Sequence, residues 1–170
     1  MDRSRDQIFA EWMKAHLPVL HRISRAFAGP ADQHDLLQEL MLAVWKAAPA
    51  FRGDSSPATF VYRVAHNRAL TWHRRTVGWR LRARDAEGEA VRRVMEAADD
   101  GDEGALLERL YAAIRRLKAV DRSIVLLSLE GLSYLEIGAI HGLSETNVGA
   151  RLSRVRARLS TLVEEPDDGL

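Results

Sequence analysis

The sequence predicts an all-α protein made of two small helical domains joined by a flexible linker. Apolar residues recur at helical spacing in both halves of the chain, and capping and turn residues separate the helical segments. A hydrophobic content of 46% excludes wholesale disorder. We expect domains at residues 1–77 and 105–163, a linker at 78–104 and an acidic tail at 164–170.

The first half begins with helical periodicity between Ile8 and Ala28, where Pro18 marks a kink or a break. Gly29-Pro30 ends that segment, and Asp32 offers an N-cap for a helix over residues 33–47. The side of this helix expected in the core carries Leu37, Leu40, Met41, Val44 and Ala48. The outward side carries Asp35, Gln38, Glu39 and Leu42. Periodicity alone favours ordinary solvent exposure for that outward side.

A loop over residues 51–57 precedes a third helix, because Gly53 and Asp54 suit a turn and Pro57 suits the first helical position after a serine cap. That helix, over residues 58–75, carries a core side of Phe60, Val61, Val64, Ala65 and Leu70. The rest of its surface holds Tyr62, Arg63, His66, Asn67, Arg68, Trp72, His73, Arg74 and Arg75. Aromatic rings among arginines suit single-stranded nucleic acid, since rings stack on bases and guanidinium groups hold phosphates. Periodicity does not decide whether Tyr62 and Trp72 are such rings or core residues.

The sequence of the second half predicts four further helices. An amphipathic one is defined by Leu106, Leu107, Leu110, Ile114 and Leu117, and a short apolar one covers residues 124–129. Ser133 and Glu136 form a capping box for the next helix, and Gly142 suits its end. Ser144 caps the last helix, whose apolar stripe is Val148, Leu152, Val155, Leu159 and Leu162.

The last two of these segments are typical of a helix-turn-helix, since a tight glycine-containing turn joins a short helix to a longer, basic one. The basic residues lie off the apolar stripe and are Arg151, Arg154, Arg156 and Arg158. Capped helix pairs with exposed arginines also occur in proteins that never touch DNA. The turn spacing and the one-sided basic face nevertheless favour nucleic acid.

The formal net charge of +1 conceals a segregation of charge along the chain. No acidic residue occurs from Ser55 to Arg84, whereas acidic residues dominate from Asp85 to Glu103. This asymmetry suggests a polyanionic partner for the basic segment.

Residues with the pattern of a catalytic or metal site are missing from the sequence. It has no cysteine, and its histidines show no standard zinc-ligand spacing. It also lacks a phosphate-binding glycine loop and a nucleophile elbow, so we expect no enzyme and no cofactor. No apolar run has membrane-spanning length and no signal-peptide core is present, so a cytoplasmic location is expected.

Two sets of residues resemble conserved regions of bacterial RNA polymerase sigma factors of the sigma-seventy family. Residues 35–39, 44–45, 51–55 and 60–67 look like the second region, and residues 129–137 and 148–159 look like the fourth. Two such regions in this order, without room for others, resemble the small extracytoplasmic-function (ECF) type. The resemblance implies a transcription initiation factor that binds core RNA polymerase and directs it to promoters, opening the minus-ten element.

The resemblance also implies three groups of contact residues. Docking on the clamp helices of the largest polymerase subunit would use Asp35, Gln38, Glu39 and Leu42. Binding of the minus-ten strand would use Phe51, Arg52, Asp54, Tyr62, Arg63, Asn67, Trp72, Arg74 and Arg75, with Phe51 and Asn67 at flipped-out bases. Binding of the minus-thirty-five element would use Ser144, Asn147, Gly149, Ala150, Arg151, Ser153, Arg154 and Arg158. An anti-sigma factor is a further expected partner.

Several positions depart from the family's usual residues. Phe60, His66 and Thr71 stand where tryptophan, arginine and aspartate are usual. Gly149 and Ala150 replace a basic residue followed by serine. Recognition of the minus-thirty-five element would then be weak, shifted to Asn147, Arg151 or Ser153, or unusually dependent on partners. Two rival functions therefore stay open: a helix-turn-helix regulator acting without polymerase, and a decoy that binds an anti-sigma factor.

Overall fold

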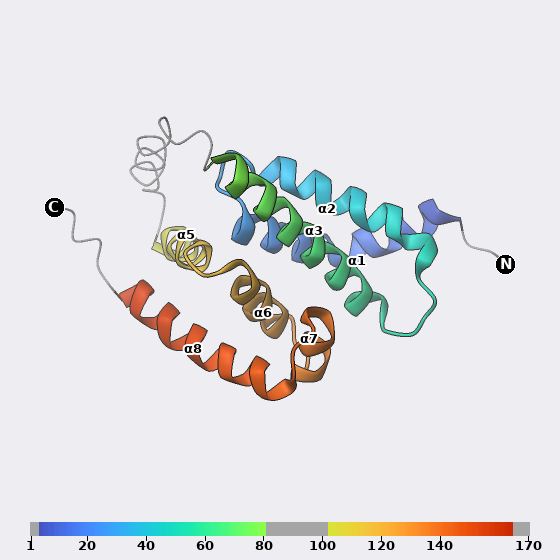
Figure 1. The fold of residues 1–170 in the computed structure, drawn as a ribbon. Helices are drawn as coiled ribbons and strands as arrows, with labels where there is room; N and C mark the ends of the chain where they lie inside the picture. Colours follow the sequence, from blue (N-terminus) through green and yellow to red (C-terminus); the bar gives the residue numbers. More distant parts are fainter. Residues whose placement is uncertain (1–3, 81–101, 165–170) are drawn as a thin grey trace.

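The computed structural model describes residues 4–80 and 102–164, and it contains only helices and short connections in these ranges (Figure 1). The helices are α1 (Arg5–Phe27), α2 (Gln33–Ala47), η1 (Ala48–Ala50), α3 (Pro57–Arg80), α5 (Asp102–Arg115), α6 (Ala119–Leu129), α7 (Tyr134–His141) and α8 (Glu145–Glu164). The prediction of an all-α fold is confirmed. Residues 81–101 of the expected linker and 165–170 of the expected tail lie outside the described residues.

Helices α1, α2 and α3 form a bundle in which each helix packs against the other two. A capping box between Ser4 and Gln7 starts α1, and Ser56 Oγ accepts the backbone N–H of Thr59 at 3.0 Å in the first turn of α3. The interior of the bundle is filled by fully buried Leu20, Ile23, Leu36, Leu40, Val44 and Val61.

Three local expectations for this bundle are refined by the structure. Pro18 does not break α1, which runs through it with the proline exposed. Leu36 is fully buried and Met41 only half-buried, so the core side of α2 is rotated toward Leu36. Asp32 is the N-cap residue of α2, as predicted, but its side chain makes no capping bond.

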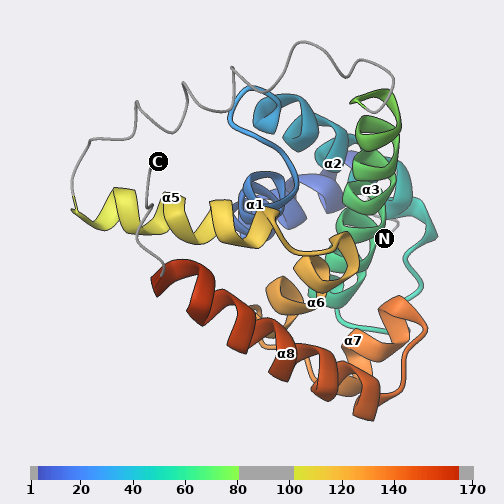
Figure 2. The ribbon, with the colours of Figure 1, turned by 60° about the vertical axis from the view of Figure 1, so that its left-hand side comes forward.

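In the second half, α5 and α6 both pack on α8, and α7 joins α6 to α8 (Figure 2). The predicted stripe of α8 is confirmed where the structure describes its side chains, with Val148, Leu152 and Val155 buried. The predicted stripe of α5 holds only in its later turns. Leu106 and Leu107 are exposed, because the first turns of α5 extend beyond the helices that cover Ile114 and Leu117.

The turn between α7 and α8 depends on two glycines. Gly142 ends α7 with φ of +67°, a left-handed conformation that favours glycine. Gly138 has no space for a side chain, since a Cβ there would lie 2.4 Å from the carbonyl oxygen of Leu143. The N–H of Leu143 in turn donates to the carbonyl of Gly138 at 2.9 Å. The close approach of these two backbone segments sets the angle between α7 and α8.

The two halves are not separate in this structure. Helix α6 lies between the first bundle and α8, with α1 against α5 and α6, and α3 against α6 (Figure 2). Buried apolar residues form one continuous cluster from Trp12 to Val155.

We predict that Gly138→Ala lowers the free energy of unfolding by about 1–3 kcal/mol, the range of overpacking in a closely packed site. Alanine would otherwise favour a helix by about 1 kcal/mol over glycine, so the sign of the change tests the contact with Leu143. The matched control is Gly149→Ala, where the new Cβ meets only the movable ring of Tyr134 at 3.3 Å. Urea titration followed by circular dichroism measures both variants; an unchanged or increased stability of Gly138→Ala would contradict the prediction.

Candidate nucleic-acid interface

The helix-turn-helix presents the start of α8 to solvent. Ser133 and Glu136 form the predicted capping box, and the backbone N–H and hydroxyl of Ser133 both bond to the Glu136 carboxylate, which lowers the pKa of that carboxyl group. Ser144 Oγ accepts the N–H of Asn147 at 3.2 Å, as a helix cap does. The exposed members of the predicted set on this helix are Ser144, Asn147, Ala150, Ser153, Arg154 and Arg158.

Arg151 differs from the other arginines of α8. Its Nη1 donates to Asp121 Oδ1 of α6 at 2.7 Å, and its side chain is half-buried. The sequence predicted Arg151 on the exposed basic face of the helix. Its ion pair with Asp121 could not be predicted, because the two residues lie far apart along the chain and meet only in the fold. Arg151 and Asp121 line a hollow of about 340 Å³ between α6 and α8, which is also lined by Lys118, Arg154 and Arg158.

Gly149 is half-buried beneath the ring of Tyr134, which reaches across from α7. Tyr134 remains exposed beside it, at the point where α7 and α8 meet. An aromatic ring therefore covers the position of the missing basic side chain at residue 149. Sequence reasoning did not identify Tyr134 as a member of this surface, because the two residues approach each other only through the helix-turn-helix angle.

On α3, the aromatic and basic residues divide between core and solvent. Arg63, Asn67, Arg74 and Arg75 are exposed. Tyr62 is only 8% exposed and its ring meets that of His16 edge-on, with centroids 5.6 Å apart. The structure therefore places Tyr62 with the core, and burial followed by the nearby Glu130 raises its pKa. Trp72 is half-buried and packs against the apolar cluster.

The loop before α3 is anchored by an aromatic cluster. The ring of Phe51 is 5.3 Å from that of Trp12 and 5.2 Å from that of Phe60, in edge-on geometry. Arg52 and Asp54 project from this loop into solvent. The guanidinium of Arg63 lies 5.5 Å above the Phe60 ring, which connects the loop cluster to the exposed side of α3.

The outward side of α2 carries exposed Asp35, Gln38 and Leu42. Leu42 is 49% exposed, which is unusual for a large apolar side chain in a bundle. Glu39 is half-buried and accepts from Arg68 Nη2 of α3 at 2.6 Å. Gln38 Nε2 lies 3.0 Å from His34 Nε2 one turn earlier.

His66 was expected on the outer surface of α3, and that expectation is wrong. It is fully buried where α3 meets the second half, and its Nδ1 lies 2.7 Å from Ser123 Oγ of α6. Ser123 Oγ is also 2.9 Å from His141 Nε2 of α7. Burial, with a smaller contribution from His141, lowers the pKa of His66 to about 3. Burial and then Arg151 lower the pKa of His141.

Comparison with known proteins identifies the two halves. The family model described as "Sigma-70 region 2" matches residues 12–80, and the one described as "Sigma-70, region 4" matches residues 107–159. The ECF RNA polymerase sigma-E factor of Escherichia coli (strain K12) is 30% identical over 155 residues, covering 86% of this chain and 81% of the relative. The protein is an ECF sigma factor.

A second relative belongs to the same type, and two solved structures have a similar fold. The ECF RNA polymerase sigma factor SigM of Mycobacterium tuberculosis (strain ATCC 25618 / H37Rv) is 28% identical over 163 residues, covering 93% of this chain and 76% of the relative. The fold is similar to that of sigma factor RpoE of Bartonella quintana, solved with the anti-sigma factor NepR, at a TM-score of 0.67 and 20% identity, with 95% and 98% of the chains covered. It is also similar to CnrH, solved with the cytosolic domain of CnrY, at a TM-score of 0.61 and 22% identity, with 92% and 87% covered.

As a sigma factor, this chain is a transcription initiation factor that acts with core RNA polymerase on promoter DNA. Among its described residues, no group of three or more histidines and carboxylates is placed to hold a metal ion. None of its described helices is long and apolar enough to cross a membrane.

We predict that Arg154 and Arg151 of the sigma factor differ in their effect on the salt dependence of promoter binding. Arg154→Ala should reduce the slope of log affinity against log salt by about 1, the loss of one phosphate contact. Arg151→Ala should change that slope less, because the ion pair with Asp121 occupies its guanidinium group. The measurement is fluorescence anisotropy of a promoter duplex with reconstituted holoenzyme, and exposed Arg156→Ala is the control. Equal slopes for the Arg154 and Arg156 variants would remove Arg154 from the phosphate contacts.

Proposed function

We propose that the sigma factor uses three separate surfaces, one for polymerase and two for the promoter. The observation that carries this proposal is the match of region 2 to α1–α3 and of region 4 to α5–α8, in this order. We keep the proposed domains at residues 1–77 and 105–163, joined by residues 78–104 and followed by residues 164–170. The sigma factor acts in the cytoplasm by binding alone and makes or breaks no covalent bond.

The surface for polymerase is the outward side of α2. It combines an exposed apolar side chain, Leu42, with the carboxylates and amide of Asp35, Glu39 and Gln38. The ion pair with Arg68 holds the Glu39 side chain in one position, which reduces the entropy lost on docking.

The surface for the opened minus-ten strand is the exposed side of α3 with the preceding loop. Arg63, Arg74 and Arg75 supply positive charge for phosphates, and the Asn67 amide can both donate to and accept from an unpaired base. Arg52 and Asp54 extend this surface along the loop, which Phe51 fixes to the bundle. Phe51, Tyr62 and Trp72 would stack on bases only after leaving part of their present packing.

The surface for the minus-thirty-five element is the exposed side of α8 around Asn147, Ser153, Arg154 and Arg158. Gly149 and Ala150 provide no side chain that can hydrogen-bond to a base, so hydrogen-bonded sequence readout falls to Asn147 and Ser153, with Ser144 at the helix start. Arg151 would contribute after release from Asp121. We therefore expect the affinity of α8 for the minus-thirty-five element to come mainly from phosphate contacts.

An anti-sigma factor is a further proposed partner. Both solved structures named above are complexes, the sigma factor RpoE with the anti-sigma factor NepR and CnrH with the cytosolic domain of CnrY. The proposal for this chain rests on those complexes and on the exposed apolar residues Leu129 and Leu135 at the start of the helix-turn-helix.

We predict that Gln38→Ala combined with Glu39→Ala lowers the amount of core polymerase that co-purifies by at least about tenfold, because loss of interface hot spots costs about 2 kcal/mol or more. The matched control is Arg68→Ala, which breaks the same ion pair but leaves both proposed contact residues in place. Undiminished binding by the double variant would favour the regulator that acts without polymerase.

We predict that Asn67→Ala slows promoter opening about tenfold while co-purification with polymerase is unchanged. The reason is the loss of a base contact worth about 1–3 kcal/mol. The measurement is the fluorescence of 2-aminopurine placed in the minus-ten element, with exposed Lys14→Ala of α1 as the control. Opening at the natural rate would exclude Asn67 from strand capture.

A further inference from the structure

The hollow between α6 and α8 has the dimensions and the lining of a small binding site. Its volume of about 340 Å³ lies at the lower end of the range for small-ligand pockets in proteins. Its apolar lining is Leu117 and Val155, each only 4% exposed. Its charged lining is Lys118, Asp121, Arg151, Arg154 and Arg158. The hollow therefore combines buried apolar side chains with a concentration of charge.

Positive charge prevails in this hollow, because four of the charged side chains are cations and only Asp121 is an anion. Asp121 is already paired with Arg151 at 2.7 Å. Within residues 4–80 and 102–164, no carboxylate forms an ion pair with Lys118, Arg154 or Arg158. Three cationic side chains of the hollow can therefore bind an anion from another molecule.

The cations of the hollow come from two helices. Arg151, Arg154 and Arg158 follow one another at intervals of three and four residues, so they lie on one side of α8. Lys118 lies across the hollow from them, at the start of α6. An anion between α6 and α8 would thus meet positive charge from both sides.

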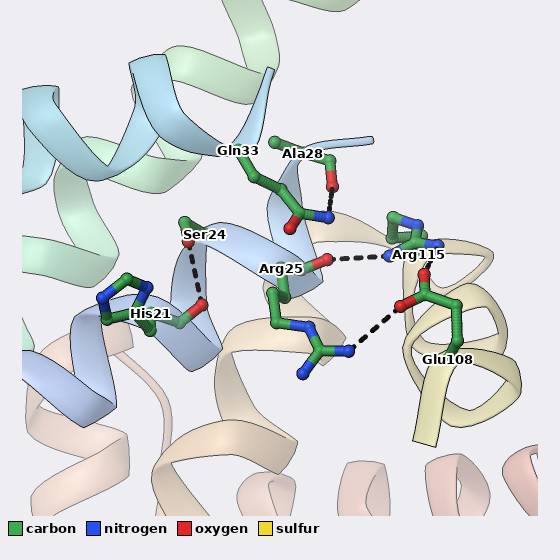
Figure 3. Close-up of polar contacts among 7 residues, drawn as sticks. All are labelled: His21, Ser24, Arg25, Ala28, Gln33, Glu108 and Arg115. Carbon is green, nitrogen blue, oxygen red and sulfur yellow. Dashed lines mark hydrogen bonds and ion pairs between the residues drawn. The ribbon is translucent and has the colours of Figure 1, made fainter. Parts of the chain in front are cut away.

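The same fold contains an anionic group that is held in this way. Glu108 accepts from Arg25 Nη2 of α1 at 3.0 Å and from Arg115 Nη2 of α5 at 2.9 Å (Figure 3). Burial alone would raise the pKa of the Glu108 carboxyl group, but the two arginines lower it overall. Two guanidinium groups from different helices are therefore enough to stabilise a partly buried anion in this protein.

Phosphate is the anionic group that fits the donors of the hollow best. It offers more acceptor oxygens than a carboxylate, and a guanidinium group can donate two parallel hydrogen bonds to it. Arg151 reaches Asp121 through Nη1 alone. The pair therefore lacks the two-bond geometry of Arg22, which donates to Glu130 from both Nε and Nη2. A phosphate in the hollow could offer Arg151 the bonds that Asp121 does not.

We propose that the hollow between α6 and α8 is a phosphate-binding site. Lys118 joins the arginines of α8 in holding the anion, and Asp121 competes with the anion for Arg151. A backbone phosphate of the duplex along α8 is one source, and a free phosphorylated solute is the other. With the first source, the inference rests on the proposed function and extends the minus-thirty-five surface from α8 to the start of α6.

The first experiment measures how salt affects binding of the holoenzyme to a promoter duplex that it selects from a random library. We expect Lys118→Ala to reduce the slope of log affinity against log salt by about 1, as the loss of one phosphate contact does. Asp121→Asn should raise the affinity about fivefold, because it releases Arg151 from a partly exposed ion pair. The control is Arg156→Ala, which removes an exposed cation of α8 that does not line the hollow.

The competition for Arg151 is tested by combining Asp121→Asn with Arg151→Ala. If Arg151 moves from Asp121 to the phosphate, most of the gain from Asp121→Asn disappears in the combined variant. Equal gains with and without Arg151 would overturn the competition, because the carboxylate would then act only through its own charge.

The second experiment uses the full chain without polymerase or DNA, with inorganic phosphate as the probe. Nuclear magnetic resonance of the arginine Nε–Hε groups follows the titration. Saturable shifts with an affinity that falls at least about threefold in Lys118→Ala, but not in Arg156→Ala, would show a site for a free phosphate. An effect of Lys118→Ala in the duplex experiment alone would assign the site to the DNA backbone.

The phosphate site would be overturned if Lys118→Ala behaved like Arg156→Ala in both experiments. Failure of the proposed function has a different signature. In that case the natural chain forms no holoenzyme, while the titration with inorganic phosphate still tests the hollow, and absence of binding there would also overturn the site.

Discussion

The junction between the halves depends on a single hydroxyl group. Ser123 Oγ has one proton and lies between two imidazole nitrogens, so it can donate to one ring while it accepts from the other. This hydroxyl can therefore satisfy one ring that presents a bare nitrogen and one that presents an N–H. A charged His66 would place a second N–H at Nε2, which is buried without an acceptor. A neutral His66 side chain therefore favours the packing of α6 against α3.

The charged contacts around the junction follow from the same exclusion of water. Arg122 is buried, yet it donates from Nε to the carbonyl of Leu117 at 2.9 Å and from Nη2 to the carbonyl of Arg115, so it satisfies the end of α5. Burial, with Arg115 as a second cause, lowers the pKa of Arg122 to about 10. Glu108 shows the opposite balance, since burial would raise its pKa but the bonds from Arg115 and Arg25 lower it overall.

The sequence predicts the helices of this protein much better than the contacts between its halves. Capping by Ser133 and Ser144, the end at Gly142 and the stripe of α8 are local features, and the structure has them. Burial of His66 and Tyr62 could not be predicted, because periodicity within α3 does not reveal that a second helical unit covers its polar side. The pairs of Arg22 with Glu130 and of Arg151 with Asp121 join residues remote in the chain, where no spacing rule applies. Which exposed residues meet polymerase or DNA stays a prediction from resemblance.

The unpaired nitrogen of His66 links the packing of the two halves to pH. A solvent-exposed imidazole titrates near pH 6.5, whereas the pKa of buried His66 is about 3. Exposing His66 to water therefore takes up a proton anywhere in this interval, and burying it again releases one. The contribution of this group to the packing is complete above about pH 6.5 and falls by about 1.4 kcal/mol for each unit of acidification below that. Acidification therefore weakens the contact between α3 and α6.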